Sequence, residues 1–315
     1  MRGGARRGKA RAMLATFGAL APVFILIALG WLLRARGFPG DHFWPAAERL
    51  VYFVLFPPLL FLTTAAADLA ALDLLPIAGA LIAGIGATVA LAIVLRPVLR
   101  IGDTGFTSVF QGAIRCNTYV GLAAGSVLFG QIGLTIMGLV VFVVVTMVNL
   151  LSVVALVHYG RRGSGRREVV GSVARNPLIL ACVVGFGSNA LGIELPAVAY
   201  DTLDILARAS LTLGLLCVGA GLELAHLGRH RLAAVLTAAL KLLLMPAATA
   251  LACRLLGIDG VSAAAAVLFT ACPISASSYV LARQLGGDAT LLAGLITITT
   301  IAAAVTMPLV LAFLT

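Results

Sequence analysis

Four polar side chains interrupt an otherwise apolar stretch of the chain. Residues 106–129 have the length and composition of a membrane-crossing helix, yet Arg115, Asn117, Thr118 and Tyr119 fall near its midpoint. Charged and amide groups are costly at that depth unless they face a partner or a cavity. Such guanidinium, amide and hydroxyl groups can bind a polar solute, or they can simply join neighbouring helices by hydrogen bonds.

A second apolar stretch, residues 261–285, carries a comparable set of polar groups after a central Pro273. Proline removes a backbone donor and disrupts the helix around it, so we expect an interruption here. In lipid, the carbonyl groups that lose their partner need a protein, water or ligand donor instead. The polar residues that follow are Ser275, Ser277, Ser278 and Tyr279.

The two interrupted stretches correspond to each other in sequence. A shift of 160 residues places Asn117-Thr118-Tyr119 opposite Ser277-Ser278-Tyr279. Paired, interrupted spans with amides and hydroxyls at mid-depth are typical of the substrate site of a secondary transporter. Either set alone could serve only to hold helices together or to kink one of them. The match between the two favours a binding site.

Lys241 is a further candidate for this site. It lies ten residues after Arg231 in an apolar run, about 15 Å along a helix, which is too deep for comfortable snorkelling. Its ammonium group could attract an anionic substrate, or act as a fixed counter-charge that stabilises an unwound segment. A third alternative is that it only reaches sideways to carbonyl groups of neighbouring helices.

The elements that must position these residues are membrane-spanning helices. The chain is 61% hydrophobic and 11% charged, with a mean hydropathy of +1.11, whereas soluble domains carry about a quarter charged residues. Stretches of about 20 apolar residues, long enough to cross a bilayer as helices, follow one another with short connections. The ten predicted spans are 14–33, 44–66, 74–97, 106–129, 132–157, 177–193, 205–224, 232–256, 261–285 and 289–314.

The spans fall into two similar halves of five. At a shift of 155 residues one pattern recurs: Pro22, Gly30 and Gly37 correspond to Pro177, Gly185 and Gly192. We therefore predict an all-α polytopic membrane protein with two repeats, residues 14–157 and 177–315. An odd number of spans in each repeat means that the two face opposite sides of the membrane.

A basic linker, residues 158–176, divides the repeats and indicates the topology. It carries Arg161, Arg162, Arg166, Arg167 and Arg175, and arginine in short loops favours the cytoplasm. The connections after spans 1, 3, 5, 7 and 9 hold nearly all the other loop arginines. We therefore expect a multi-pass protein of the cytoplasmic membrane, with the linker inside and both termini outside.

The basic tail of residues 1–13 conflicts with an outside N-terminus. We expect either that a short tail is tolerated there or that the true start is Met13. Without this tail the net charge falls from +10 to +5, so basicity gives no argument for nucleic acid binding.

Other chemistries find little support in the sequence. The acids Asp68, Asp73, Asp103, Glu194, Asp201, Asp204 and Glu223 lie at or near loops, so no buried proton-carrying carboxylate is evident, as a cation/proton antiporter would need. A sodium site built from hydroxyls, amides and carbonyls stays open. The four histidines lie near loops and the five cysteines form no paired motif, so we predict no intramembrane enzyme, metal or cofactor.

Four motifs resemble those of the auxin efflux carrier family, in its bacterial branch. They are Pro58-Leu59-Leu60-Phe61, Arg115-x-Asn117-x-Tyr119-x-Gly121, Lys241-Leu242 with Pro246, and Ala271-Cys272-Pro273 through Tyr279-Val280-Leu281-Ala282 with Asp288 and Pro308. The resemblance covers essentially the whole chain from Met13. In one departure, Cys116 stands where plant members carry proline just before the asparagine.

The resemblance implies a fold like that of sodium/proton antiporters and bile-acid symporters, in which broken helices 4 and 9 cross. It implies a homodimer that transports small organic anions, such as malate, malonate or auxin-like acids, by alternating access with H⁺ or Na⁺ as a possible coupling ion. In that setting Asn117 would donate to a substrate carboxylate and Arg115 or Lys241 would supply positive charge. Ser277 and Ser278 would complete the polar wall.

Overall fold

The fold, seen in a computed structural model, is built from helices. The structure describes residues 2–66, 74–159, 175–223 and 230–314, and no strand longer than an isolated bridge occurs among them. Most of the 158–176 linker, including Arg161, Arg162, Arg166 and Arg167, lies outside the described residues, as do Asp68, Asp73 and His226. The helical class predicted from the apolar composition is confirmed. Helices are the expected structure in lipid because they satisfy their own backbone hydrogen-bonding groups.

The first half of the chain contains seven helical segments. They are α1 (Arg2–Ala35), α2 (Phe43–Leu50), η1 (Val51–Leu55), α3 (Phe56–Ala65), α4 (Leu74–Leu99), α5 (Asp103–Ile114) and α6 (Thr118–Tyr159). The second half contains α8 (Pro177–Ala190), α9 (Ala197–Ala220), α10 (Arg231–Ala239), η3 (Leu240–Leu244), α11 (Met245–Leu255), α12 (Gly260–Thr270), α13 (Ser277–Leu285) and α14 (Ala289–Leu314).

Seven helical stretches among the described residues are long and apolar enough to cross a membrane. They are Leu14–Ala35, Phe43–Ala65, Leu74–Leu99, Thr118–Leu156, Ala197–Ala220, Arg231–Leu255 and Ala289–Leu314. Two apolar helices, Pro177–Ala190 and Gly260–Thr270, are shorter. The long α6 bends at Gly130, whose φ of 60° and ψ of −143° are not helical, and this bend lies between the predicted spans 106–129 and 132–157. The count of ten spans remains a prediction.

In the part of the chain that the structure describes, two π-helical turns interrupt the helices, each just before a proline. Segment η1 precedes Pro57 and Pro58, and η3 precedes Pro246. Proline lacks an N–H and its ring collides with the carbonyl group four residues earlier, so the preceding turn widens. Lys241 lies within the second of these wide turns.

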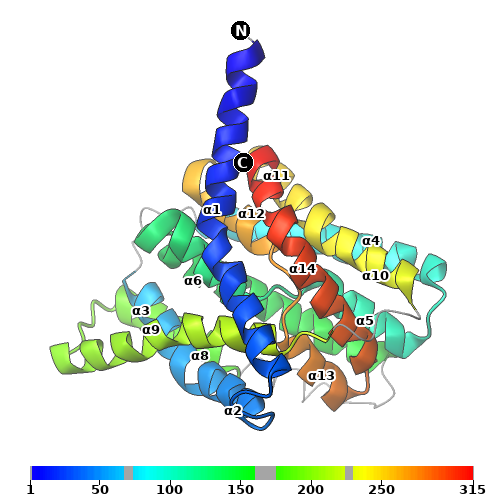
Figure 1. Cartoon of the computed structure of the whole chain (residues 1–315). Coiled ribbons are helices and arrows are strands. Elements are labelled where there is room, and N and C mark those ends of the chain that lie inside the picture. The colour runs from blue at the N-terminus through cyan, green and yellow to red at the C-terminus, as the bar shows by residue number, and fades with distance from the viewer. Residues whose placement is uncertain (1, 67–73, 160–174, 224–229, 315) are drawn as a thin grey trace.

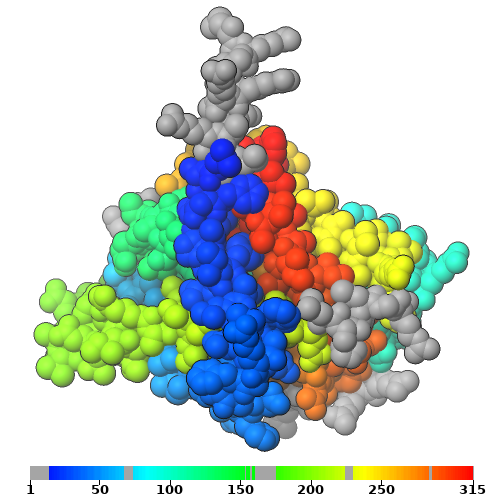
Figure 2. Space-filling model, viewed as in Figure 1, coloured from blue at the N-terminus to red at the C-terminus, as the bar shows by residue number. Residues whose placement is uncertain are grey.

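Helix packing divides the molecule into two groups. In the first, α1 crosses α9, and α3 packs against α8 and α9. In the second, α4 packs against α11 and α5, while α12 packs against α6 and α11. Figure 1 shows α9 running across the base of α1, and Figure 2 shows α1 and α14 lying side by side on one face of the molecule.

Glycine permits the closest approaches within the first group. A Cβ atom at Gly30 of α1 would overlap the backbone carbonyl of Leu216 in α9, and one at Gly185 of α8 would overlap Thr64 in α3 and approach the carbonyl of Phe61. These helices therefore meet backbone to backbone, which is how small residues pack membrane helices.

Candidate functional site

Two breaks in the helices meet at the centre of the molecule. Helix α5 ends at Ile114 and α6 begins at Thr118, while α12 ends at Thr270 and α13 begins at Ser277. The break segments pair in antiparallel fashion at Cys116 and Ile274. Both interruptions expected from the sequence are therefore present, and they lie against each other. We call this region the crossing.

Backbone groups at the crossing have partners despite the lost helix. The N–H of Asn117 donates to the carbonyl of Pro273 at 2.8 Å. The N–H of Ile274 donates to Oγ1 of Thr299 in α14 at 3.2 Å. Pro273, expected as a helix breaker, therefore joins one break segment to the other through its carbonyl group, with its side chain buried.

Asn117 uses only one side of its amide within the protein. Its Oδ1 accepts from the N–H groups of Tyr119 at 3.1 Å and Val120 at 3.3 Å, and so caps the first turn of α6. Its Nδ2 is buried without a hydrogen-bond partner, and the residue is 1% exposed. A buried donor of this kind costs free energy unless a ligand or water fills the position.

Arg115 holds a positive charge beside this amide. Its Nη1 donates to Oδ1 of Asn149 in α6 at 2.8 Å, and its Nη2 donates to Oγ of Ser277 at 3.1 Å. The Ser277 hydroxyl also lies 2.9 Å from that of Ser275. The Nε of Arg115 is buried and unpartnered. The structure thus brings Arg115, Ser275 and Ser277 together.

Lys241 is fully buried against the other side of the crossing. Its Nζ lies 2.9 Å from the carbonyl of Thr270, 3.0 Å from Sγ of Cys116 and 3.4 Å from Sδ of Met245. An ammonium group has three donors, and each has an acceptor here. Because Thr270 is the last residue of α12, the charge lies at the negative end of that helix. This geometry favours the fixed counter-charge over direct substrate contact.

Further unpartnered polar atoms gather beside Arg115. Gln111 lies one turn earlier in α5, is 0% exposed and has no partner for either amide atom. The hydroxyls of Ser152 in α6 and Ser278 in α13 are equally buried and unpartnered. Ser278 was a candidate from the sequence, whereas Gln111, Asn149 and Ser152 were missed. The signal that could have found them is a polar residue within an apolar span.

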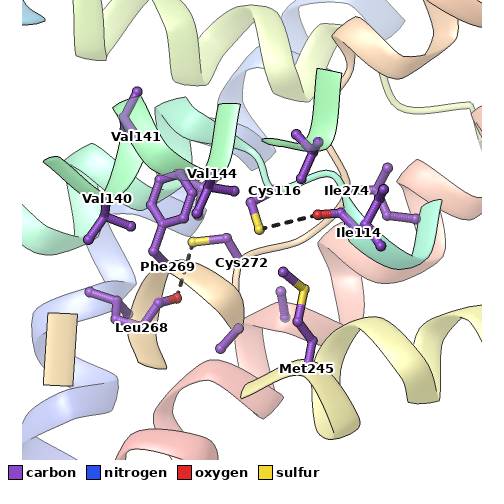
Figure 3. Close-up of a cluster of buried hydrophobic side chains, with 14 of the residues drawn as sticks. Ile114, Cys116, Val140, Val141, Val144, Met245, Leu268, Phe269, Cys272 and Ile274 are labelled. Atoms are coloured by element: carbon purple, nitrogen blue, oxygen red, sulfur yellow. Dashed lines mark hydrogen bonds between the residues drawn. The ribbon is translucent and has the colours of Figure 1, made fainter. Parts of the chain in front are cut away.

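Apolar side chains surround the crossing on one side. Figure 3 shows Cys116 and Ile274 on the break segments, with Phe269, Val140 and Val144 packed close to Cys272. Gly121 is required there, since a Cβ atom would stand 2.6 Å from the ring of Phe269. The polar atoms described above are therefore set against a dry, tightly packed wall.

Comparison with known proteins identifies the class of molecule. Residues 166–311 match the family model described as a membrane transport protein. The second half of the chain is therefore similar to this family, that of the auxin efflux carriers. The chain is also similar to an "Uncharacterized transporter" of Methanothermobacter thermautotrophicus, with 27% identity over 291 residues that cover 91% of this chain and 94% of the relative. The resemblance stated from the motifs is confirmed, and the family is one of transporters, not of enzymes.

The remaining candidate residues lie at the edges of the crossing. Thr118 begins α6 and is 8% exposed. The ring of Tyr119 meets that of Phe56 in α3 edge-on, with centroids 4.6 Å apart, and rests on Gly214 of α9. Tyr279 instead lies under the guanidinium of Arg283, 5.9 Å from its ring centroid. Tyr119 thus touches the first helix group, and Tyr279 contacts a cation at the far end of α13.

Glu48 lies near the start of one membrane-crossing stretch, and Asp201 and Asp204 lie near the start of another, Ala197–Ala220. Glu48 belongs to the stretch Phe43–Ala65 and is half-buried. It interacts electrostatically with Tyr119 and with Cys217 of α9. Glu48 was not among the acids considered from the sequence, and its place near the start of span 2 does not contradict the expectation that no acid lies at mid-membrane.

No metal-binding cluster is found where the structure describes the chain. Groups of three or more histidine, cysteine, aspartate or glutamate residues close enough to hold an ion do not occur there. The five cysteines are free and buried.

Proposed function

We propose that this membrane transporter carries small organic anions, of the size of simple carboxylic acids, by alternating access. The observation that carries this proposal is the set of buried donors at the crossing that have no partner. Nδ2 of Asn117, Nε of Arg115 and Nε2 of Gln111 can only donate, and the Ser152 and Ser278 hydroxyls can also donate. A carboxylate supplies the acceptors that such groups need.

Charge at the crossing supports the same choice of ligand. Among the described residues the ion pairs are Arg96–Asp103 and Arg208–Asp204, both at exposed sites. Arg115 and Lys241 therefore have no carboxylate partner among the described residues. The first turns of α6 and α13 also open at the crossing, and the N-terminal end of a helix favours negative charge.

The packing of the helices supports a duplicated and inverted architecture of ten spans. Gly30 of α1 meets the carbonyl of Leu216, and Gly185 of α8 meets that of Phe61. A shift of 155 residues relates Gly30 to Gly185 and Phe61 to Leu216. The glycine lies in the first half of the chain in one contact and in the second half in the other. Gly37 and Gly192, related by the same shift, both have positive φ, 72° and 62°.

The two helix groups supply the parts that alternating access requires. We infer that α1, α2, α3, α8 and α9 form a scaffold, and that the remaining helices, which carry the crossing, form a core that moves against it. Tyr119 of the core rests on Phe56 and Gly214 of the scaffold. Motion at this contact would expose the donors of the crossing to one side of the membrane and then to the other. The homodimer remains a prediction.

The test separates the two sides of the Asn117 amide. An Asn117→Asp variant keeps the oxygen that caps α6, since aspartate caps as well as asparagine, but replaces the free donor with an acceptor. We expect it to fold with an unchanged melting temperature in detergent and to lose exchange of labelled organic acids in proteoliposomes. Asn117→Ala removes both atoms, so we expect it to lose exchange and also some stability.

A panel of labelled mono- and dicarboxylates, assayed as exchange without any ion gradient, identifies the substrate. Inorganic cations serve as the competing class, because a cation antiporter on the same fold would move those instead. Normal exchange of an organic acid by a well-folded Asn117→Asp protein would contradict the assignment of the site.

A further inference from the structure

Glu48 stands on the scaffold surface that faces the crossing. Glu48, Tyr52 and Phe56 follow one another four residues apart along α2, η1 and the start of α3. In a regular α-helix residues four apart drift by about 40° around the axis at each step. The wide π-helical turn of η1 offsets part of that drift, so the three side chains keep to one face.

The neighbours of Phe56 and Tyr52 show which part of the molecule this helix face is turned toward. Phe56 meets Tyr119 edge-on, and Tyr52 interacts electrostatically with Arg115. Glu48 itself interacts electrostatically with Tyr119. The row of Glu48, Tyr52 and Phe56 therefore faces the residues that form the proposed anion site, and the carboxyl group of Glu48 lies at the outer end of the row.

The carboxyl group of Glu48 has no cation to neutralise it. Among the described residues it makes no ion pair or hydrogen bond, and the titratable groups around it are Tyr52, Tyr119 and Cys217, which are neutral near pH 7. Of the nearby arginines, Arg34 of α1 donates to the carbonyl of Ala220 and Arg49 is exposed. A half-buried carboxylate in apolar surroundings without a counter-ion is energetically costly.

We propose that Glu48 binds the proton that accompanies the anion through the membrane. This inference rests on the proposed function and names its coupling ion. While Glu48 is ionised, its negative charge opposes the entry of an anion at Arg115. One proton converts the carboxylate to the neutral acid, and the anion then binds. Because Glu48 faces the crossing, the movement of the core that opens the crossing to the other side also opens the carboxyl group to that side. The anion leaves and the proton is released there, so one proton travels with each anion.

The experiment compares wild type with Glu48→Gln and Glu194→Gln in proteoliposomes. Glutamine imitates the neutral acid permanently. Glu194 is exposed in the connection between α8 and α9, so it provides the same substitution away from the site. Two quantities are measured: exchange of the best labelled acid across a range of equal internal and external pH, and its net accumulation under an inward proton gradient. A pH-sensitive dye inside the vesicles records proton entry.

For one proton per monoanion, a gradient of one pH unit supports an accumulation of about tenfold. We expect wild type and Glu194→Gln to show this accumulation, proton entry that depends on the acid, and exchange that slows as the pH rises. In Glu48→Gln we expect no accumulation above the external concentration, no proton entry, and exchange whose rate no longer varies with pH. Glu48→Asp, which can still bind a proton, should restore the accumulation.

The outcomes separate the two proposals. If wild type exchanges none of the organic acids, the proposed function fails. If wild type exchanges an acid but the gradient drives no accumulation, or if Glu48→Gln accumulates it as wild type does, the assignment of Glu48 is wrong while the function stands. Accumulation driven by a sodium gradient alone would overturn the proton in favour of Na⁺.

Discussion

Two nearby side chains at the crossing combine structural and binding roles in separate atoms. The side-chain oxygen of Asn117 caps α6, and its nitrogen has no partner. The two Nη atoms of Arg115 donate to Asn149 and Ser277, and its Nε has no partner. Because each side chain is fixed by the atoms that already have partners, the free donors are held in place before any substrate arrives. Such preorganisation lowers the entropy lost on binding.

Arg115→Lys tests the geometry of this cation. Lysine keeps the positive charge but lacks the planar guanidinium group. Its ammonium group cannot donate to both Asn149 and Ser277 while it holds another donor in the position of the arginine Nε. A hydrogen bond to a charged group is worth about 1.5–3 kcal/mol, so we expect the half-saturating substrate concentration to rise about tenfold or more, measured by exchange at several concentrations. Arg254→Lys, at the exposed end of α11, is the matched control and should leave it unchanged. An unaltered value in Arg115→Lys would mean that only charge matters there.

At the scale of helices, glycines and prolines define the mobile and the rigid contacts. Pro57, Pro58 and Pro246 follow wide turns that place Tyr52 and Lys241, whereas Gly30 and Gly185 bring helix backbones into direct contact. A backbone contact leaves little freedom for sliding between α1 and α9. Under the proposed function, the scaffold would behave as one unit against which the core moves.

Gly30→Ala tests the backbone contact between α1 and α9. The added Cβ overlaps the Leu216 carbonyl, and overpacking of this kind costs about 1–3 kcal/mol. We expect a lower melting temperature in detergent. Gly18→Ala is the control on the same helix, where a Cβ meets nothing within 4 Å; it should be neutral or stabilising by up to about 1 kcal/mol, because alanine favours helix. Equal stability of the two variants would refute the close contact.

At the scale of the whole molecule, the two halves are expected to face opposite sides of the membrane. The connections that hold Asp41 and Glu194 are related by the shift of 155 residues that links Gly37 to Gly192, and both acids are exposed. Inversion places these two connections on different sides. From the loop charges we expect Asp41 to lie in the cytoplasm and Glu194 outside.

Single-cysteine variants at these positions check the topology. We expect a membrane-impermeant maleimide to label Glu194→Cys on intact cells and to label Asp41→Cys only after permeabilisation. The five native cysteines are buried, so wild type provides a low background. Labelling of both variants from the same side would show that the halves are parallel.

The sequence predicted the helical class, the two breaks and most residues of the crossing, because polar groups and a proline within apolar runs are local signals. It could not predict the partners of Lys241, which come from Cys116, Met245 and Thr270 on three different segments. Nor did it reveal Gln111, whose significance lies in its lack of partners, or Glu48, whose facing depends on a π-helical turn. Those features require the tertiary arrangement.

The bond between the two break segments has a consequence for the evolution of substrate range. It joins the N–H of Asn117 to the carbonyl of Pro273, so it belongs to the main chain and does not depend on which side chains line the crossing. Under the proposed function, mutation of the surrounding serines, amides or arginine can change which substrate is transported. Such mutations leave in place the main-chain hydrogen bond that joins the two broken helices. The substrate range can therefore change during evolution while the backbone link between the two broken helices is kept.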